Sequence, residues 1–176
     1  MSIPVHAGAV DNPCMQLPQE KHNMENTLLR RPTRELDLLA WSRQLKTVAF
    51  NDLRAVRFLS NAIFSLREAR SPQRAPSGRY VIAHDGIYSL CLGSMYLHGL
   101  LPVGKEGQKE LVVQLGLDML KVPTPTRNLV LASRKLLVTT TTEAIDSIDD
   151  NDVRDLTHIG QLCIDRARRV YPEWFG

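Results

Sequence analysis

Apolar residues recur at every third or fourth position over most of this 176-residue chain, the spacing of amphipathic α-helices. The clearest case begins at Asn51, a good N-cap, and runs to Arg70, just before the proline-containing loop 71–78. The apolar stripe that should face the core of this helix consists of Leu53, Val56, Leu59, Ala62, Ile63 and Leu66. The side chains that fall off the stripe, and are expected in water, are Arg54, Arg57, Arg67 and Arg70.

The same spacing predicts four further helices. The first begins near Thr33, the next covers Gln108 to Leu120, and a third starts at Thr124 and ends in the threonine run 139–142. The last begins at Ser147, whose offset to Asp150 resembles a capping box, and ends before position 172. The apolar positions expected inside the two C-terminal helices are Leu129, Val130, Ala132, Leu136 and Leu137, and then Val153, Leu156, Gly160, Cys163, Ala167 and Val170.

A helix from Arg79 to His98 has a different texture, because small residues dominate one of its stripes. Gly86, Ser89 and Gly93 share that stripe, and glycine inside a helix costs about 1 kcal/mol relative to alanine. Close approach of another helix would offset this cost. We therefore expect these three residues to form a helix-packing interface, either in the centre of a bundle or between two copies of the chain.

No segment shows convincing period-two alternation, so the predicted fold is all-α. We expect an irregular N-terminal arm over residues 1–26, followed by a single domain, residues 27–176, built as an up-and-down bundle of four to five helices. No apolar run approaches the ~20 residues of a membrane span, and the N-terminus lacks the basic region of a secretory signal. A cytoplasmic protein with no membrane partner is expected.

Charge changes this picture only slightly. The formal net charge of +3 is too small to imply nucleic acid by itself. Residues 27–80 nevertheless carry eleven Arg or Lys against four Asp or Glu, whereas residues 143–165 carry seven acidic side chains and one arginine. This segregation favours partner contacts or a weak polyanion-binding face, or it reflects two solvated helix faces.

Candidate chemistry is sparse. The chain has no phosphate-binding glycine loop, nucleophile elbow or zinc-protease motif, and its three cysteines lack paired spacing, so no cofactor or metal is expected. His84 is adjacent to Asp85, but neighbouring helical residues point about 100° apart, so it is expected on a polar face or an interface. His98 lies at a helix C-terminus, where it can cap carbonyl groups.

The order of these features resembles the HEPN-like helical proteins. The resemblance rests on the tyrosine- and small-residue-bearing helix 79–98, the turn HGLLPVGKEG (residues 98–107), the helix RNLVLASRKLLVTTTTEA that follows Thr126, and the SIDD turn before the last helix. It covers about 100 residues, from Arg79 to Phe175, with the helix 51–70 as the first bundle member. Where histidines often follow the turn in that superfamily, this chain has Gln108 and Lys109.

The resemblance implies a helical bundle that is commonly a homodimer, and several members are ribonuclease toxins or RNA-processing modules. Nuclease members use an Arg-x(4–6)-His motif on the helix that matches residues 126–144. This chain supplies arginines there but no histidine between His98 and His158, so no side chain near that helix titrates around neutral pH. The nuclease role is therefore not carried over, although Arg127, Arg134 and Lys135 remain a candidate phosphate- or partner-contacting patch.

We therefore expect a non-catalytic HEPN-like protein that acts by dimerisation and by binding a partner protein or RNA, in the manner of toxin–antitoxin or defence-type systems. One alternative is a metal-independent ribonuclease with an atypical site, in which His84 or His98 reaches Arg134 at a dimer seam. The other is a purely structural or regulatory subunit with no nucleic-acid role.

Overall fold

A computed structural model describes residues 44–104, 108–139 and 147–175. The expected arm over residues 1–26 and the helix expected near Thr33 lie outside the described residues, as do positions 140–142 of the threonine run. The helices are α2 (Asp52–Glu68), α3 (Pro76–Leu97), α4 (Gln108–Met119), α5 (Thr124–Thr139) and α7 (Asp150–Val170), and the 3₁₀ turn η1 (Pro172–Trp174) follows them. The prediction of a mainly α-helical bundle is confirmed for these residues.

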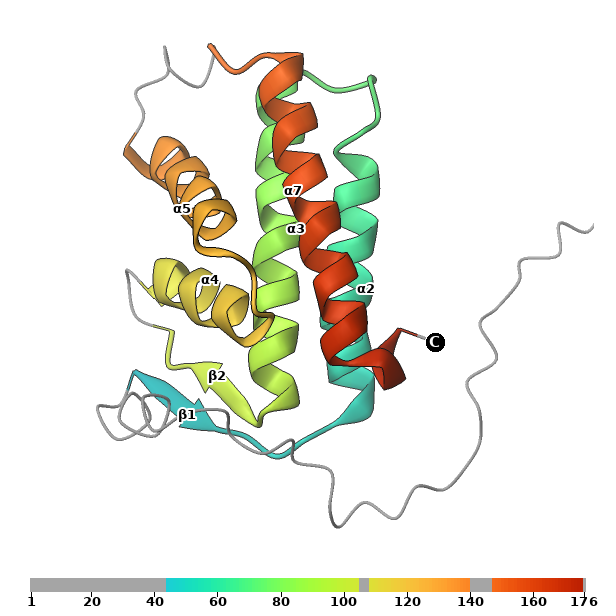
Figure 1. Cartoon of the computed structure of the whole chain (residues 1–176), viewed down its shortest axis with the longest axis vertical. Helices are drawn as coiled ribbons and strands as arrows, with labels where there is room; N and C mark the ends of the chain where they lie inside the picture. The colour runs from blue at the N-terminus through green and yellow to red at the C-terminus, as the bar shows by residue number, and fades with distance from the viewer. Residues whose placement is uncertain (1–43, 105–107, 140–146, 176) are drawn as a thin grey trace, which may run out of the picture.

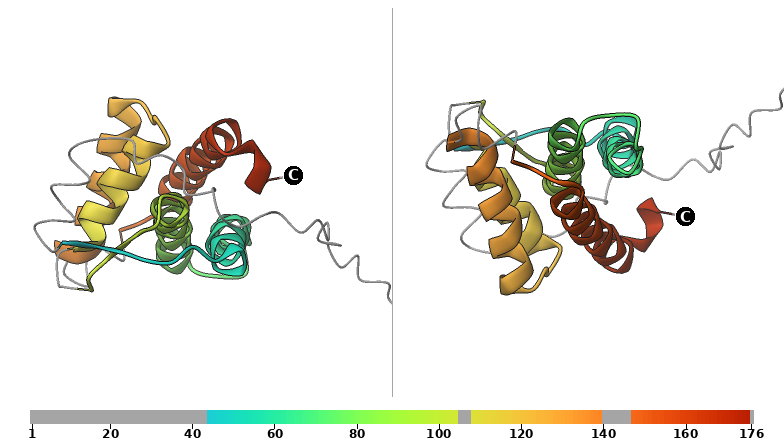
Figure 2. Two further views of the ribbon diagram at one scale, coloured as in Figure 1. Left: turned by 90° about the horizontal axis from the view of Figure 1, so that it is seen from below. Right: turned by 90° about the horizontal axis from the view of Figure 1, so that it is seen from above.

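Helix α3 is the centre of the molecule. Figure 1 shows α2 and α7 running beside it, while α4 and α5 stack on its other side, and the end-on views of Figure 2 show the same two groups. Twelve of the 22 residues of α3 are buried, so the helix has no consistent polar face. Its packing against helices on both sides explains why its sequence is apolar nearly all round.

The small-residue stripe of α3 packs inside the chain. A Cβ atom added to Gly86 would lie 3.0 Å from the Leu66 side chain, and one added to Gly93 would lie 2.9 Å from that of Leu59. Both neighbours belong to α2, and Ser89 between the two glycines is half-buried. Of the two expected packing modes, the structure shows the one within a bundle.

Two short strands correct the prediction that the chain has none. Strand β1 (Leu45–Thr47) pairs antiparallel with β2 (Leu100–Pro102), so that Lys46 lies opposite Leu101. Gly99, with φ of 68°, ends α3 and turns the chain into β2. Strands of three residues are too short for an alternating pattern to be recognised.

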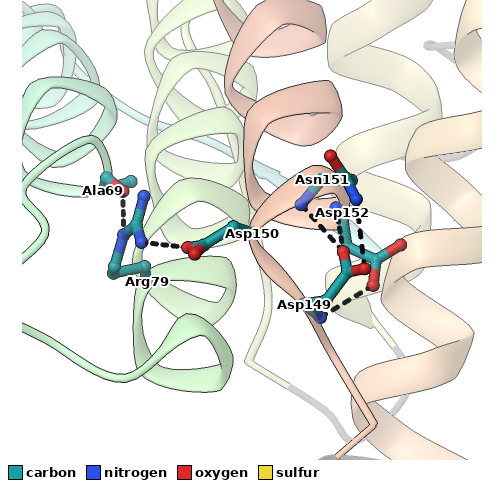
Figure 3. A network of polar contacts seen from close by, with 6 residues as sticks. All are labelled: Ala69, Arg79, Asp149, Asp150, Asn151 and Asp152. Atoms are coloured by element: carbon teal, nitrogen blue, oxygen red, sulfur yellow. Dashed lines mark hydrogen bonds and ion pairs between the residues drawn. The ribbon is translucent and has the colours of Figure 1, made fainter.

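The N-terminus of α7 also differs from the prediction. Its N-cap is Asp149 rather than Ser147, and the capping box is formed by Asp149 and Asp152 (Figure 3). Beside it, Arg79 donates to the Ala69 carbonyl oxygen at 2.9 Å and to the Asp150 carboxylate at 2.5 Å, which ties together the ends of three helices. Helix α3 begins at Pro76, three residues before the predicted start, because proline is well suited to the first turn of a helix.

The predicted core is right for most positions and wrong for four. Leu53, Ile63 and Leu129 were expected inside, but their side chains are 71%, 40% and 57% exposed, and Ala132, also expected inside, is exposed as well. Helix α2 instead buries a stripe displaced around its axis, which consists of Ala55, Leu59, Ala62 and Leu66. The expected seam of α7 is buried from Val153 to Ala167 and half-buried at Val170.

Candidate functional site

The three residues of the candidate phosphate patch on α5, Arg127, Arg134 and Lys135, have different surroundings in the structure. Arg127 forms an ion pair with Asp118 at 2.6 Å and donates to the Thr124 hydroxyl at 3.0 Å, so it holds α5 to the end of α4. Lys135 is exposed, and Arg134 is half-buried with no ion pair to an acidic side chain of the described residues. Arg127 therefore has a structural role, and Arg134 is the arginine of the patch without such a pairing.

His84 is buried, so of the two positions expected for it, a polar face or an interface, the polar face is wrong. Its side chain is 1% exposed, and neither ring nitrogen has a hydrogen-bond partner among the described residues. Burial, together with the positive charges of Arg134 and Lys109, lowers the pKa of His84 to about 4. The imidazole is therefore neutral at physiological pH and lies within the field of two cations from α5 and α4.

Two tyrosines flank His84 at one helical turn on either side. Tyr80 hydrogen-bonds to Ser133 of α5, and burial raises the pKa of its hydroxyl. Tyr88 is half-buried with a raised pKa, also mainly from burial, and the Lys109 ammonium lies 5.9 Å from its ring centre. Among the described residues, this face of α3 thus packs against α4 and α5 through aromatic rings and without an ion pair.

His98 lies at the C-cap of α3, as predicted, and far from His84. The two are fourteen positions apart on one helix, which corresponds to roughly 21 Å. His98 is buried, and its Nε2 is 2.9 Å from the Tyr171 hydroxyl, which joins the ends of α3 and α7. The structure therefore brings His84, and not His98, into the field of Arg134.

The most prominent surface feature is the outer face of α2, the side turned away from α3. Leu53 and Phe64 are 71% and 63% exposed, and Arg57 lies between them on the same stripe. No described element covers these side chains. We call Leu53, Arg57 and Phe64 the α2 stripe.

A groove of about 850 Å³ runs beside the N-terminal half of this stripe. Its floor is Tyr96, which is 1% exposed and donates from its hydroxyl to the Ala49 carbonyl oxygen at 3.1 Å. The Arg54 guanidinium lies over the Tyr96 ring at 5.4 Å and over the Phe58 ring at 5.9 Å. The rest of the lining is mixed and shares two residues with the α2 stripe: it consists of Ala49, Asn51, Leu53, Arg57 and Asn61.

Sequence reasoning missed this surface because it assigned Leu53 to the core. Phe64, which directly follows Ile63 and lies off the predicted stripe, was the available signal. A helix with large apolar side chains on two faces has either two buried faces or one exposed binding face. The expectation that the arginines of α2 lie in water is confirmed, since Arg54, Arg57, Arg67 and Arg70 are all exposed.

Other classes of site are not seen in the part of the chain that the structure describes. No group of three or more histidine, cysteine or acidic side chains has the geometry of a metal site there, and none of the described helices has the length and apolarity to cross a membrane. Cys91 and Cys163 are buried free thiols whose pKa values are raised by burial, as expected of small core residues.

Comparison with known proteins adds no relative. No family model matches the chain, and neither a curated protein nor a solved structure was found to be similar to it. The resemblance to HEPN-like proteins therefore stays a prediction.

Proposed function

We propose that this chain is a non-catalytic HEPN-like helical protein that dimerises and binds a partner protein or RNA through the outer face of α2. The observation that carries the proposal is the exposure of Leu53 and Phe64 on the α2 stripe. Large apolar side chains together with arginine are typical of the centres of protein interfaces. Exposing them in a monomer would be unfavourable unless a partner covers them.

A second copy of the chain is the partner that fits the spacing of the stripe. Leu53 and Phe64 are about three helical turns apart, roughly 16 Å. If two α2 helices pack antiparallel about a two-fold axis near Arg57 and Ser60, each Leu53 meets the Phe64 of the other copy. The same patch then serves on both subunits, as a closed homodimer requires.

The solution mass of the purified protein tests this proposal. We expect a dimer for the wild type, and at least a 30-fold weaker dissociation constant for Phe64→Ser, since truncation of a central aromatic residue costs about 2 kcal/mol or more. Leu129→Ser is the matched control, because Leu129 is 57% exposed on α5. A wild-type monomer, or equal weakening by both variants, would show that the stripe does not mediate association.

The ribonuclease alternative is the second candidate, and one observation favours it. The Arg134 charge acts on His84 within a single chain, without a dimer seam. Against it, an imidazole that is 1% exposed has no contact with a substrate phosphodiester, and a pKa of about 4 leaves it without a proton to donate at neutral pH. RNA cleavage by the purified chain that is lost in Arg134→Ala would promote this candidate, and absence of cleavage would remove it.

A further inference from the structure

We propose that the cavity between the start of α5 and the C-terminal half of α7 binds a small organic carboxylate with a compact apolar body. This inference goes beyond the proposed function and does not rest on it, because no residue that lines the cavity belongs to α2. Three features of the cavity carry the inference: its size, its apolar wall, and two arginines that have no ion-pair partner among the described residues.

The cavity forms where the chain turns from α4 into α5. Lys121, with φ of 54°, lies in this turn, and the N–H of Val122 donates to the Leu117 carbonyl oxygen at 3.0 Å. Pro123 then leads into α5, and α7 supplies the rest of the lining. The volume of the cavity is about 180 Å³. Pockets for drug-sized ligands measure roughly 300–1,000 Å³, so this cavity suits a single small molecule.

One part of the lining is apolar and consists of Val122, Pro123 and Leu162. Val122 belongs to the core and is 4% exposed, whereas the Leu162 side chain is 44% exposed beside the cavity. An apolar ligand group placed against this wall would remove both its own surface and that of Leu162 from water, which is favourable. The ligand is therefore expected to have an apolar body, which a bare inorganic anion lacks.

The other part of the lining is charged. Arg166 is half-buried and Arg169 is exposed, and neither forms an ion pair with an acidic side chain in the part of the chain that the structure describes. Asp165 also lines the cavity, but its carboxylate already accepts from the Gln161 amide at 3.1 Å and from the Arg168 guanidinium at 3.4 Å. Two arginines against one aspartate give the lining a net charge of +1, which suits a ligand with a single negative charge.

A monocarboxylate fits these features better than other small molecules. It carries one negative charge, and the planar guanidinium of arginine binds two carboxylate oxygens through parallel N–H donors. Thr126, in the first turn of α5, adds a hydroxyl donor to the lining. Inorganic phosphate has no apolar part to cover Leu162, and an uncharged molecule of the same shape would leave Arg166 and Arg169 without a partner.

Benzoate is a suitable probe, because it combines a carboxylate with a compact ring. It is titrated into the isotope-labelled full-length protein, and NMR follows the backbone N–H signals of Thr126 and Leu162. We expect saturable shifts with a dissociation constant of about 1 mM or lower, which is within reach of a ligand of about nine non-hydrogen atoms. Benzamide, which keeps the ring but has no charge, and inorganic phosphate, which has no ring, should each bind about fivefold more weakly or less.

Four variants make the test specific. Arg166→Gln and Arg169→Gln should each weaken benzoate binding about fivefold or more and leave the affinity for benzamide unchanged. Leu162→Ser should weaken the binding of both molecules, because both place a ring against the apolar wall. Arg154→Gln is the matched control, since Arg154 is an exposed arginine of α7 that does not line the cavity. The same NMR spectra report whether each variant is folded.

Selective weakening of benzoate binding by the two cavity arginine variants, with normal binding by Arg154→Gln, supports the inference. The absence of saturable shifts at about 20 mM benzoate overturns it. Equal affinity for benzamide, tighter binding of phosphate, or equal weakening by Arg154→Gln also overturns it. Dimerisation is measured separately by solution mass, so a wild-type dimer that does not bind benzoate removes only this inference, and a wild-type monomer that binds benzoate removes only the proposed dimer.

Discussion

Protonation of His84 is expected to destabilise the fold between neutral pH and about pH 4. The imidazole is 1% exposed and has no hydrogen-bond partner in the part of the chain that the structure describes, and its pKa is lowered from 6.5 to about 4 by burial, Arg134 and Lys109. The unfolded chain therefore takes up a proton at His84 before the folded chain does. Stability from this residue is complete above the unfolded pKa and is lost as pH falls toward the folded value.

The magnitude follows from the difference between the two pKa values. Each pKa unit corresponds to about 1.4 kcal/mol, so a fall from 6.5 to about 4 amounts to about 3 kcal/mol. Because the ring is almost fully buried, solvent screening does not reduce this figure substantially. A loss of this size is a large fraction of the free energy of unfolding of a typical domain.

Urea denaturation followed by circular dichroism, at about pH 7.5 and about pH 4, measures this effect. Carboxylates also titrate in that interval, so the informative quantity is the comparison with His84→Leu, which removes the ionisable group and retains apolar bulk. We expect the variant to lose about 3 kcal/mol less than the wild type between the two pH values. At about pH 7.5 it should be at least as stable, since an unsatisfied polar group is removed.

His158→Gln is the matched control, because His158 is exposed on α7 and its replacement should leave the wild-type difference unchanged. If His84→Leu and the wild type lose the same stability on acidification, then His84 is solvated or hydrogen-bonded, and the account of the α3, α4 and α5 packing is wrong.

Three smaller perturbations test individual packing and capping arguments, each by thermal and urea unfolding. Gly116→Ala should lower the free energy of unfolding by about 1–3 kcal/mol, because the added Cβ would overlap Cys91 of α3. Gly78→Ala is the control and should be neutral or stabilising, because no atom lies within 4 Å of the added Cβ. A larger loss of stability for Gly78→Ala than for Gly116→Ala would refute the close contact between α3 and α4. Lys121→Gly should raise the free energy of unfolding by roughly 0.5 kcal/mol, because Lys121 has φ of 54°, a left-handed conformation that glycine adopts more easily than lysine. Destabilisation by this substitution would contradict a left-handed C-cap at the end of α4. Asp149→Ala should lower the melting temperature through loss of the α7 capping box, and an unchanged value would argue against that cap.

The helices themselves could be predicted from the sequence, because their signals are local. The Asn51 cap and the ends of α2 and α4 agree with the structure to within one or two residues. Asn51 accepts the backbone N–H of Arg54 at 3.0 Å, the bond that its residue type predicts. The cap of α7 was placed two residues early because Ser147 and Asp149 both precede acidic residues three positions later, and only the structure distinguishes them.

The exposed α2 stripe, the proposed binding surface, could not be predicted, because its recognition needs tertiary information. Periodicity places Leu53 and Ile63 on the same side of α2 as Leu59. The stripe that packs on α3, however, depends on the positions of Gly86 and Gly93, where α2 can come close to α3. That approach turns Ala55 and Ala62 inward and leaves Leu53 in water. The groove likewise needs Tyr96 from α3 beneath Arg54, and these residues are 42 positions apart in the sequence.

The glycines of α3 therefore influence the proposed function as well as the stability. Because Gly86 and Gly93 have no side chains, α2 lies close to α3, with Leu59 and Leu66 against the glycines and Ala55 and Ala62 on the same buried stripe. The larger side chains, Leu53 and Phe64, are displaced outward and form the α2 stripe. The exposed surface is thus a consequence of how tightly the two helices pack, which is why a core argument that counts apolar residues alone assigns Leu53 to the wrong side.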